Sequence, residues 1–538
     1  MRNWRPEIGS RTAALAVGLW MLVTCNDTFW PLVYKDFGGL TPTAITFGLS
    51  ISLLILTLMV ALSAKVIFKP FAILFLLTAA GASYFTDTFG TIINEQMIDS
   101  AMTTNQREAG ALVGGRFLLH FGFYGLLPVL LLLWVRLRHE TIGIKIRNNL
   151  KLIVPMLAAT GVMVWLHIGT YIVTIRQDNI LMQTLNPVAP IAAAYNYAHT
   201  QLTYSDVVAE PLGTDAKRNA TFAAERKPVV TVLIAGETGR AMNFALNGYG
   251  RDTNPKLKAL DIVNFSNVTS CGTDTATSIP CMFSVYPRKD YSEGKARGTE
   301  NLLDVFRHAG IETMWWDNNT GSKGVADRVK YVPYMDTKDA VNCPDDECRD
   351  TVFLGPLDKT LDAVTKDTVI VLHQIGSHGP AYFRRYAADQ RVFTPDCQTT
   401  DLPKCSLDEV RNAYDNSIIA TDAFIADVIG RLKSRDGRFS SALLYVSDHG
   451  ESLGENGIFL HGAPYAFAPK EQTHVPMVGW FSPGYREMNG IDMACLAKQS
   501  GNPYSHDNWF HTALGMMGVE TSAYQPELDM FRACRAKG

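Results

Sequence analysis

The stretch VVTVLIAGET at residues 229–238 decides the fold of the second half of this chain. Its β-branched and aliphatic residues form one unbroken apolar run, which is typical of a strand buried on both faces of a sheet. The run ends in the polar residues Glu237 and Thr238. Two further runs, VIVL at 369–372 and ALLYV at 442–446, are also followed by polar residues. Together they predict an α/β fold with a central, mostly parallel sheet that binds ligands at the carboxyl ends of its strands.

The first half of the chain is far more apolar. A membrane-spanning helix needs about 20 mostly apolar residues, and five segments meet or approach that length, at roughly 12–31, 45–66, 71–89, 117–136 and 152–174. We therefore predict five transmembrane helices. The first is interpreted as a signal anchor rather than a cleaved signal peptide, because its run lacks a small-residue cleavage site and four more spans follow it.

Positive charges predict the orientation of these helices, because short cytoplasmic loops are enriched in Lys and Arg. One side of the membrane would carry Arg2, Arg5, Arg11, Lys65, Lys69, Arg136, Arg138, Lys145, Arg147 and Lys151. The other side would carry only Lys35, Arg107 and Arg116. We assign the richer side to the cytoplasm, so an odd number of spans places everything after residue 175 in the periplasm.

These patterns divide the 538 residues into three parts. Residues 1–175 are expected to form the transmembrane domain, 176–228 a linker with short helices, and 229–538 a soluble domain. Helical patterns at 299–309 and 408–433 supply crossover connections for the sheet. The net charge of −3 offers no basic surface for a polyphosphate backbone, which argues against nucleic acid as a partner.

Eight of the nine cysteines lie after residue 270. Three pairs at short spacings predict disulfides and therefore an oxidising compartment: Cys271/Cys281, Cys343/Cys348 and Cys397/Cys405. The two remaining cysteines, Cys495 and Cys534, would complete the set. Zinc sites built from cysteine are the alternative, although the chain has no Cys-x-x-Cys pair. Cys25 lies in an apolar run and is expected to be a small core residue.

Potential metal ligands follow the predicted strands. The third strand leads into SDHGESLGE at 447–455, whose adjacent Asp448 and His449 offer oxygen and nitrogen ligands that suit tetrahedral zinc. Glu237 follows the first strand, and HQIGSHGP at 373–380 follows the second. Any one of these histidines alone is more typical of a hydrogen-bonded structural residue. The constellation of five between residues 373 and 474 nevertheless favours a metal-dependent hydrolase or transferase: His373, His378, His449, His461 and His474.

A nucleophile is expected near such a metal, and the stretch SCGTDTATSIPC at 270–281 encloses several hydroxyl groups in a predicted disulfide. A hydroxyl becomes an effective nucleophile when a metal lowers its pKa or a base removes its proton. Backbone N–H groups at a helix N-terminus would also stabilise phosphoryl oxygens. The alternative is a Ser/Thr-rich capping loop, and the residues by themselves do not choose among Thr273, Thr275 and Thr277.

These motifs, in this order, resemble the phosphoethanolamine transferases that modify lipid A, a family that includes the mobilised colistin-resistance enzymes. The resemblance extends over essentially the whole chain and rests on CGTDTA at 271–276, PCMFS at 280–284 and SDHGESLGENG at 447–457. It implies a soluble domain with an alkaline-phosphatase or sulfatase-like fold. It also implies a multi-pass inner-membrane enzyme that transfers phosphoethanolamine from phosphatidylethanolamine to a lipid A phosphate. A zinc-activated threonine would carry the group covalently, and the lowered negative surface charge would give resistance to polymyxins.

The resemblance assigns roles to residues at matching positions. The nucleophile corresponds to Thr275, and the ligands of one Zn²⁺ ion correspond to Glu237, Thr275, Asp448 and His449. His378 and His461 match a pair that contacts the phosphoryl group or a second zinc ion during turnover. The family gives His373 no role.

Contacts with the donor head group are implied for the polar loop at 90–116, where Ser100, Thr104 and Glu108 match the family positions. Thr320 and Lys323 match a pair that contacts the phosphate. The sequence departs from the family at Ser100, which stands in place of an Asn. It also departs at 322–326, where SKGVA replaces the Cys-Lys-Gly-x-Cys of some relatives and removes one family disulfide.

Other functions are compatible with the same residues. The acceptor could be another part of lipopolysaccharide, such as the inner sugar acid or a core heptose, or a periplasmic glucan. A sulfatase-like phosphodiesterase would use water as the final acceptor. A non-catalytic adaptor would require lost ligands, whereas this chain keeps the four predicted ones. The sequence does not predict the oligomeric state.

Overall fold

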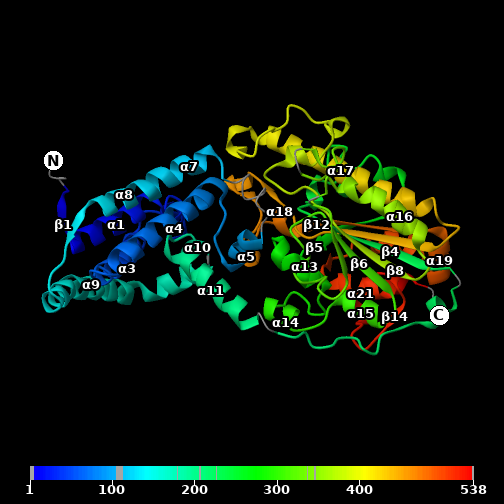
Figure 1. Cartoon of the computed structure of the whole chain (residues 1–538), viewed down its shortest axis with the longest axis horizontal. Coiled ribbons are helices and arrows are strands. Elements are labelled where there is room, and N and C mark those ends of the chain that lie inside the picture. The colour runs from blue at the N-terminus through cyan, green and yellow to red at the C-terminus, as the bar shows by residue number, and fades with distance from the viewer. Residues whose placement is uncertain are drawn as a thin grey trace. The chain divides into compact units, whose positions relative to one another are not determined.

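A computed structural model describes residues 5–103, 113–177, 180–204, 207–225, 227–335, 337–344 and 347–535. The chain divides into two compact units. The helical unit comprises Met1–Ile98 and Leu112–Ala198, and the sheet unit comprises Asp99–Ala111 and His199–Gly538. Figure 1 shows the helical unit in blue to teal, whereas the larger segment of the sheet unit, from His199 onward, follows in green to red.

Within the described residues of the helical unit, four helical runs are long and apolar enough to cross a membrane. They are α3 (Pro42–Ala61), α4 (Phe68–Phe89), the run Gly115–Trp134 and the run Ile142–Tyr171, which lies within α9 (Ile142–Gln177). The third of these contains α7 (Gly115–Phe121), one π-helical turn (Gly122–Leu126) and α8 (Leu127–Trp134). The first predicted span consists of α1 (Ser10–Thr24) and α2 (Phe29–Asp36), which are bent by 68°. Five spans result if this bent pair is counted as one.

Shorter elements complete the helical part of the chain. Strands β1 (Glu7–Gly9) and β2 (Arg136–Arg138) form a small parallel pair. After α9 come α10 (Ile180–Gln183) and α11 (Val188–Tyr204), in the segment predicted to contain short helices. The helix α5 (Glu95–Thr103) lies in the polar loop between α4 and α7.

The sheet unit is built on one large sheet, which has eight strands among the described residues in the order β13-β5-β12-β9-β4-β8-β6-β7. In that order the strands are Tyr504–Ser505, Val263–Thr269, His474–Phe481, Ser440–Ser447, Val229–Gly236, Thr368–His373, Glu312–Asp317 and Lys330–Pro333. Only β12 runs antiparallel to its neighbours within this sheet. The mostly parallel sheet is therefore confirmed, and the three predicted strands β9, β4 and β8 lie side by side at its centre.

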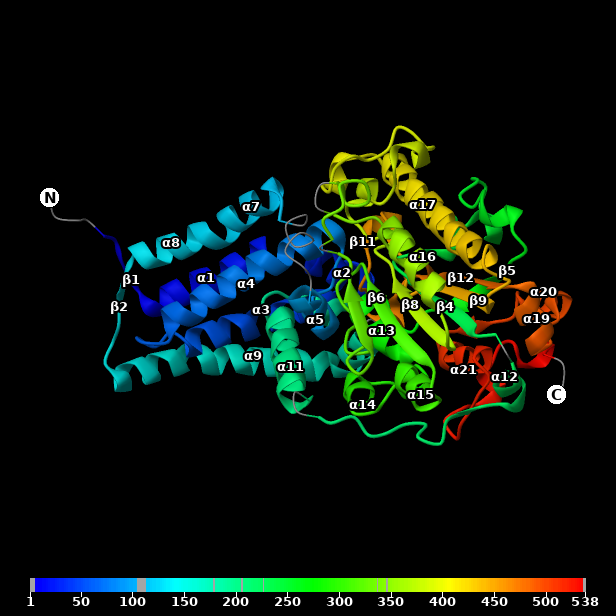
Figure 2. The ribbon, with the colours of Figure 1, turned by 45° about the vertical axis from the view of Figure 1, so that its right-hand side comes forward.

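Helices cover both faces of the sheet. Figures 1 and 2 show α16 (Leu354–Ala363) and α17 (Leu407–Lys433) above it, and α15 (Leu302–His308) and α21 (Asp507–Met516) below it. The helices α15 and α17 occupy the two predicted helical patterns. The N-terminus of α15 is fixed at Leu302 by a capping box, in which Asn301 and Asp304 exchange side-chain and backbone hydrogen bonds.

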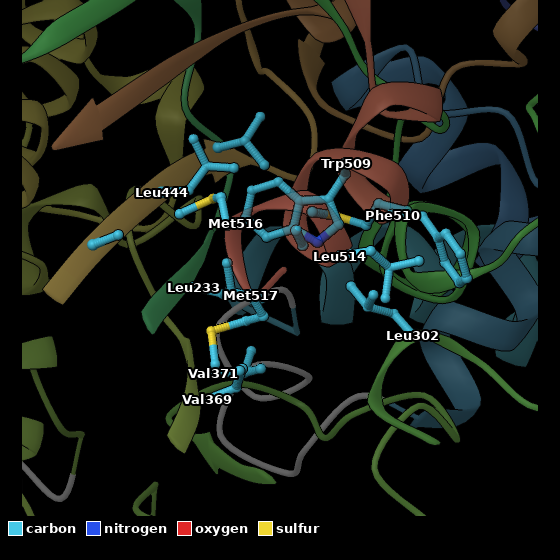
Figure 3. Packing of buried hydrophobic residues seen from close by; sticks show 14 of the residues in the cluster. Leu233, Leu302, Val369, Val371, Leu444, Trp509, Phe510, Leu514, Met516 and Met517 are labelled. Atoms are coloured by element: carbon cyan, nitrogen blue, oxygen red, sulfur yellow. The ribbon is translucent and has the colours of Figure 1, made fainter. Parts of the chain in front are cut away.

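Alternating side chains of the central strands enter two hydrophobic cores. From β4, Leu233 enters the core that also contains Trp509 and Phe510 of α21, and Figure 3 shows it beside Met517 in that core. Its neighbour Val232 points into the opposite core, where it lies with Ile425 of α17. Both faces of the strand are thus buried, which is why its sequence is an unbroken apolar run.

Four disulfides form among the described cysteines, and all are the predicted pairs: Cys271–Cys281, Cys343–Cys348, Cys397–Cys405 and Cys495–Cys534. Cys25 is a buried free thiol, as expected. The first of these disulfides encloses the hydroxyl-rich stretch that precedes and begins α13 (Thr275–Phe283).

Candidate metal and nucleophile site

Polar residues gather where four adjacent parallel strands end. Glu237 follows β4, and Asp448 and His449 follow β9. The strand β8 ends at His373, and Asn319 lies just beyond the end of β6. Because these strands are parallel neighbours, their carboxyl ends meet at one edge of the sheet.

Thr275 reaches this edge from the loop after β5. It is the first residue of α13, and the carboxylate of Asp274 caps the helix by accepting the backbone N–H of Thr277 at 2.9 Å. His506 ties the loop to β9, because its Nδ1 accepts the N–H of Cys271 at 3.0 Å and its Nε2–H donates to the carbonyl of Ser447 at 3.0 Å. Burial lowers the pKa of His506 to about 4, which keeps this imidazole neutral.

Glu237, Asp448 and His449 form a compact buried cluster, in which one ligand atom from each lies within 4.8 Å of the others. The Nε2 atom of His449 lies 3.4 Å from both Glu237 Oε1 and Asp448 Oδ2. The Nδ1–H of His449 donates to the carbonyl of Gly450 at 2.8 Å. Nε2 is therefore the ring nitrogen whose lone pair could bind a metal ion. The hydroxyl of Thr275 donates to Glu237 Oε2 at 2.9 Å and lies 3.4 Å from His449 Nε2.

This cluster has the chemistry of a divalent-cation site. Asp448 Oδ2 is a buried carboxylate oxygen without a hydrogen-bond partner among the described residues. Burial and the neighbouring Glu237 raise the pKa of Asp448 well above its ordinary value. Burial also opposes ionisation of Glu237, but His449, His378 and His461 lower the pKa of that carboxyl. A cation would stabilise both carboxylates, and two carboxylates, one imidazole and one hydroxyl form a donor set that suits tetrahedral zinc.

His378 and His461 approach the cluster from two separate loops. The ring centroid of His461 lies 4.5 Å from that of His449 and 5.4 Å from that of His378. His378 follows β8, whereas His461 follows the short strand β11 (Phe459–Leu460). The structure thus brings both predicted histidines to the edge that carries Thr275.

Two of the other histidines have structural partners. The Nδ1 atom of His373 pairs with Asp317 Oδ2 at 2.9 Å in a fully buried contact. Burial opposes protonation of His373, but Asp317 outweighs it and raises the pKa of the imidazole. His474 Nε2–H donates to the carbonyl of Ser266 at 2.8 Å, at the start of β12, and so belongs to the sheet rather than to the cluster.

Asn319 is a site residue that the sequence patterns missed. Its amide Nδ2 donates to Glu237 Oε2 at 2.7 Å and to the carbonyl of Gln374 at 2.8 Å, so it holds one carboxylate of the cluster in place. The signal was present, because β6 contains the apolar run Met314, Trp315 and Trp316, ends at Asp317 and is followed by Asn318 and Asn319. Aromatic residues in place of aliphatic ones made this strand less conspicuous.

The structure describes three of the five residues predicted to contact the donor head group or its phosphate: Thr320, Lys323 and Ser100. Thr320 follows Asn319 directly, and its carbonyl accepts the Nζ–H of Lys323 at 3.1 Å. Lys323 lines a cavity of about 400 Å³ together with Ala276 and Pro280 of α13. Ser100 lies in α5. Thr104 and Glu108 lie outside the described residues.

Comparison with known proteins agrees with this architecture. A family model described as Sulfatase matches residues 230–519, and one described as Phosphoethanolamine transferase EptA/EptB matches residues 51–202. The structure of the integral membrane protein lipooligosaccharide phosphoethanolamine transferase A (EptA) from Neisseria meningitidis superposes with a TM-score of 0.94 at 35% identity. That match covers 99% of this chain and 100% of the other. The expected fold class is therefore confirmed.

Curated relatives extend the likeness to most of the sequence. Phosphoethanolamine transferase EptA of Escherichia coli strain K12 is 41% identical over 475 residues, which are 87% of this chain and 86% of the relative. Phosphatidylethanolamine transferase Mcr-1 of Escherichia coli is 38% identical over 494 residues, or 89% of this chain and 90% of the relative. With its fold, its buried cluster and these relatives, the chain belongs to the EptA family of phosphoethanolamine transferases.

Proposed function

We propose that this protein transfers phosphoethanolamine from phosphatidylethanolamine to a phosphate of lipid A, with Thr275 as the covalent carrier. The observation that carries the proposal is the position of Thr275 Oγ1, 2.9 Å from Glu237 Oε2 and 3.4 Å from His449 Nε2. A buried hydroxyl held against a carboxylate and an imidazole of a cation site has the setting of an activated nucleophile. The likeness to EptA and Mcr-1 supports the choice of transferred group.

We assign one zinc ion to Glu237, Asp448, His449 and Thr275, and leave a second ion during turnover as an extension of the same proposal. A bound zinc would lower the pKa of the Thr275 hydroxyl and offset the charge of phosphoryl oxygens. The donor set described above fits this ion. In the first turn of α13 the N–H of Thr277 is already bound to Asp274, and the N–H groups of Thr275 and Ala276 would stabilise the same phosphoryl oxygens.

The first step is a displacement at the phosphorus atom of the donor. A bond forms between Thr275 Oγ1 and the phosphorus atom, and the bond from phosphorus to the diacylglycerol oxygen breaks. The hydroxyl proton of Thr275 passes to the released diacylglycerol, and we assign its transfer to His378 or His461. Their approach to the cluster from two loops supports this role.

The second step returns the enzyme to its starting state. The hydroxyl oxygen of a singly protonated lipid A phosphate forms a new bond to phosphorus, the bond from phosphorus to Thr275 Oγ1 breaks, and the proton of the attacking hydroxyl passes to Thr275 Oγ1. The product carries an added ammonium group, which lowers the net negative charge of the outer surface. Weaker attraction of cationic polymyxins is the expected consequence.

The proposed location is the inner membrane, with residues 1–175 as the transmembrane domain, 176–228 as the linker and 229–538 as the periplasmic catalytic domain. Four apolar helices and one bent pair support membrane insertion, and the four disulfides suit an oxidising compartment. Anchoring near both lipids raises the effective concentration of donor and acceptor at the site. We keep Ser100, Thr104, Glu108, Thr320 and Lys323 as proposed donor contacts.

Mass spectrometry of lipid A tests the proposal. Cells that express the wild-type chain should gain lipid A with an added phosphoethanolamine unit, whereas cells expressing Thr275→Ala should not. Thr277→Ala is the matched control. It removes a neighbouring hydroxyl that donates to Asp274 Oδ2 at 3.3 Å and bonds to no ligand of the cluster, so the modification should remain intact. Phosphoethanolamine on a core sugar or a glucan would correct the acceptor, and hydrolysis of the donor without transfer would favour a phosphodiesterase.

A further inference from the structure

The carboxylate of Glu451 is buried between the two loops that carry His378 and His461, and it is fully shielded from solvent. Its Oε1 atom accepts the hydroxyl hydrogen of Tyr382 at 2.6 Å. Its Oε2 atom accepts the Nδ1–H of His461 at 2.8 Å. One side chain therefore connects a residue of the loop after β8 to a histidine of the loop after β11.

The Tyr382 end of this connection is fixed by packing. The phenol ring lies edge-on to Tyr414, with ring centroids 5.5 Å apart, and Tyr382 is 1% exposed. Gly379 makes room for it, because an added Cβ there would lie 2.7 Å from the Tyr382 oxygen. Burial and the adjacent Glu451 raise the pKa of Tyr382 well above its ordinary value. The phenol therefore stays protonated and donates.

The His461 end sets the chemistry of the imidazole. A carboxylate accepts hydrogen bonds and donates none, so the Nδ1 atom of His461 must carry a proton to pair with it. Nε2 is then the ring nitrogen available to the site. The backbone on the far side of His461 is also held, because the N–H of Gly462 donates to the carbonyl of Thr273 at 2.8 Å, two residues before Thr275.

We propose that Glu451, itself oriented by Tyr382, is a positioning residue for phosphoryl transfer that fixes the tautomer and the ring direction of His461. The inference rests on the proposed function, and of the two histidines named there it selects His461 to pass the proton of Thr275 to the released diacylglycerol. Residues that orient a histidine through its second nitrogen typically change activity by about 10- to 100-fold when they are replaced. The carboxylate of Glu451 bonds to Tyr382 and His461 and not to Thr275 among the described residues, so we expect its effect to pass through His461.

A double-mutant cycle in the full chain tests this dependence. The assay follows single-turnover release of labelled diacylglycerol from phosphatidylethanolamine in detergent micelles. Glu451→Gln should lower the rate by about 10- to 100-fold in the wild-type background. In the His461→Ala background the same substitution should change the rate by less than about twofold. An equal loss in both backgrounds, or no loss in the wild-type background, overturns the inference.

Tyr382→Phe provides a second measurement that keeps the ring and removes only the donor to Glu451. It should lower kcat by up to about 10-fold with little change in KM for the donor, and an unchanged kcat contradicts the positioning role. Glu300→Gln is the matched control, because Glu300 Oε2 also pairs with a histidine, His308 Nε2 at 2.7 Å, but outside the cluster. It should retain wild-type release.

The nucleophile variant separates this inference from the proposed function. If Thr275→Ala still releases diacylglycerol and transfers the head group, the proposed function fails. If Thr275→Ala is inactive while Glu451→Gln and His461→Ala act additively, only the positioning role of Glu451 fails. Thermal unfolding of each variant checks that a lost rate is not a lost fold.

Discussion

Replacing Gly450 with Ala should disturb the ligand cluster without touching any ligand side chain. Gly450 packs against the backbone around Glu471, and its N–H donates to the carbonyl of Gln472 at 2.9 Å. A Cβ atom on Gly450 would lie 2.1 Å from the carbonyl oxygen of Glu471. That oxygen belongs to the backbone, so a change of side-chain rotamer does not relieve the clash.

The size of the effect follows from the displacement that is needed. Real Cβ contacts begin near 3.0 Å, so the two backbone segments must separate by about 0.9 Å. Overpacking of this kind costs about 1–3 kcal/mol of unfolding free energy. The carbonyl of Gly450 also accepts the Nδ1–H of His449, so the imidazole moves with it. We expect metal affinity to fall by about 10- to 100-fold.

Three measurements on the purified full chain check this prediction: zinc affinity by competition with a chelator, the thermal midpoint, and transfer of labelled phosphoethanolamine. Gly430→Ala is the control, because Gly430 lies in α17 with no atom near its missing Cβ and should gain about 0.5–1 kcal/mol. Zinc affinity and transfer that match the wild type in Gly450→Ala would refute the link from Gly450 to His449.

Two further substitutions test the surroundings of the cluster. Asn319→Ala removes the donor to Glu237 and should lower zinc affinity by about 10- to 100-fold, as measured by the same competition; unchanged affinity contradicts the role of this amide. Glu347 pairs with Arg385 at 2.5 Å and Arg384 at 3.1 Å. Burial opposes ionisation of Glu347, but these cations lower its pKa from 4.5 to about 2. The pairing therefore contributes up to about 3 kcal/mol of unfolding free energy, which is present above pH ~4.5 and lost as the pH falls toward 2. Glu347→Gln should remove that stability at neutral pH and flatten the acid loss in pH-dependent unfolding, and an unaltered curve would count against the pairing.

Hydrophobic runs predicted the centre of the sheet well. The strands β4, β8 and β9 are buried on both faces, so their sequences are continuously apolar and their polar ends are conspicuous. Strand direction could not be predicted in this way, because the apolar run of β12 does not reveal that the strand is antiparallel to both of its neighbours. Direction depends on the connections and on partners that are distant in sequence.

The break in the first span shows a second limit of sequence patterns. Asn26 lies between α1 and α2, where its Nδ2 donates to the carbonyl of Asn186 at 3.1 Å. In return, the N–H of Asn186 donates to Asn26 Oδ1 at 2.9 Å, and its Nδ2 donates to the carbonyl of Cys25 at 3.0 Å. These bonds satisfy the carbonyl of Cys25, which lies at the bend, and the backbone N–H and carbonyl of Asn186. A local hydropathy window contains no information about that distant partner.

Part of the ligand cluster could be predicted from local sequence patterns, and part depends on contacts that are distant in sequence. Glu237, Asp448 and His449 follow conspicuous strands, so their convergence could be inferred from the parallel sheet. The residues themselves did not choose Thr275 over Thr273 or Thr277, and the family resemblance supplied that choice. The distance from Thr275 to Glu237 depends on how the loop after β5 folds. His506 and the disulfide Cys271–Cys281 determine that fold, whereas strand order does not. The role of Glu451 emerged only from its contacts, and that of Asn319 was missed although a strand precedes it.

Trapping the covalent carrier identifies the nucleophile of this enzyme. The purified chain is incubated with phosphatidylethanolamine in the absence of lipid A, quenched in acid and digested, and the peptide that contains residues 271–281 is sequenced by mass spectrometry. We expect one phosphoethanolamine unit on Thr275, retained in Thr277→Ala and absent from Thr275→Ala. A unit on another residue, or head-group transfer that persists in Thr275→Ala, would contradict it.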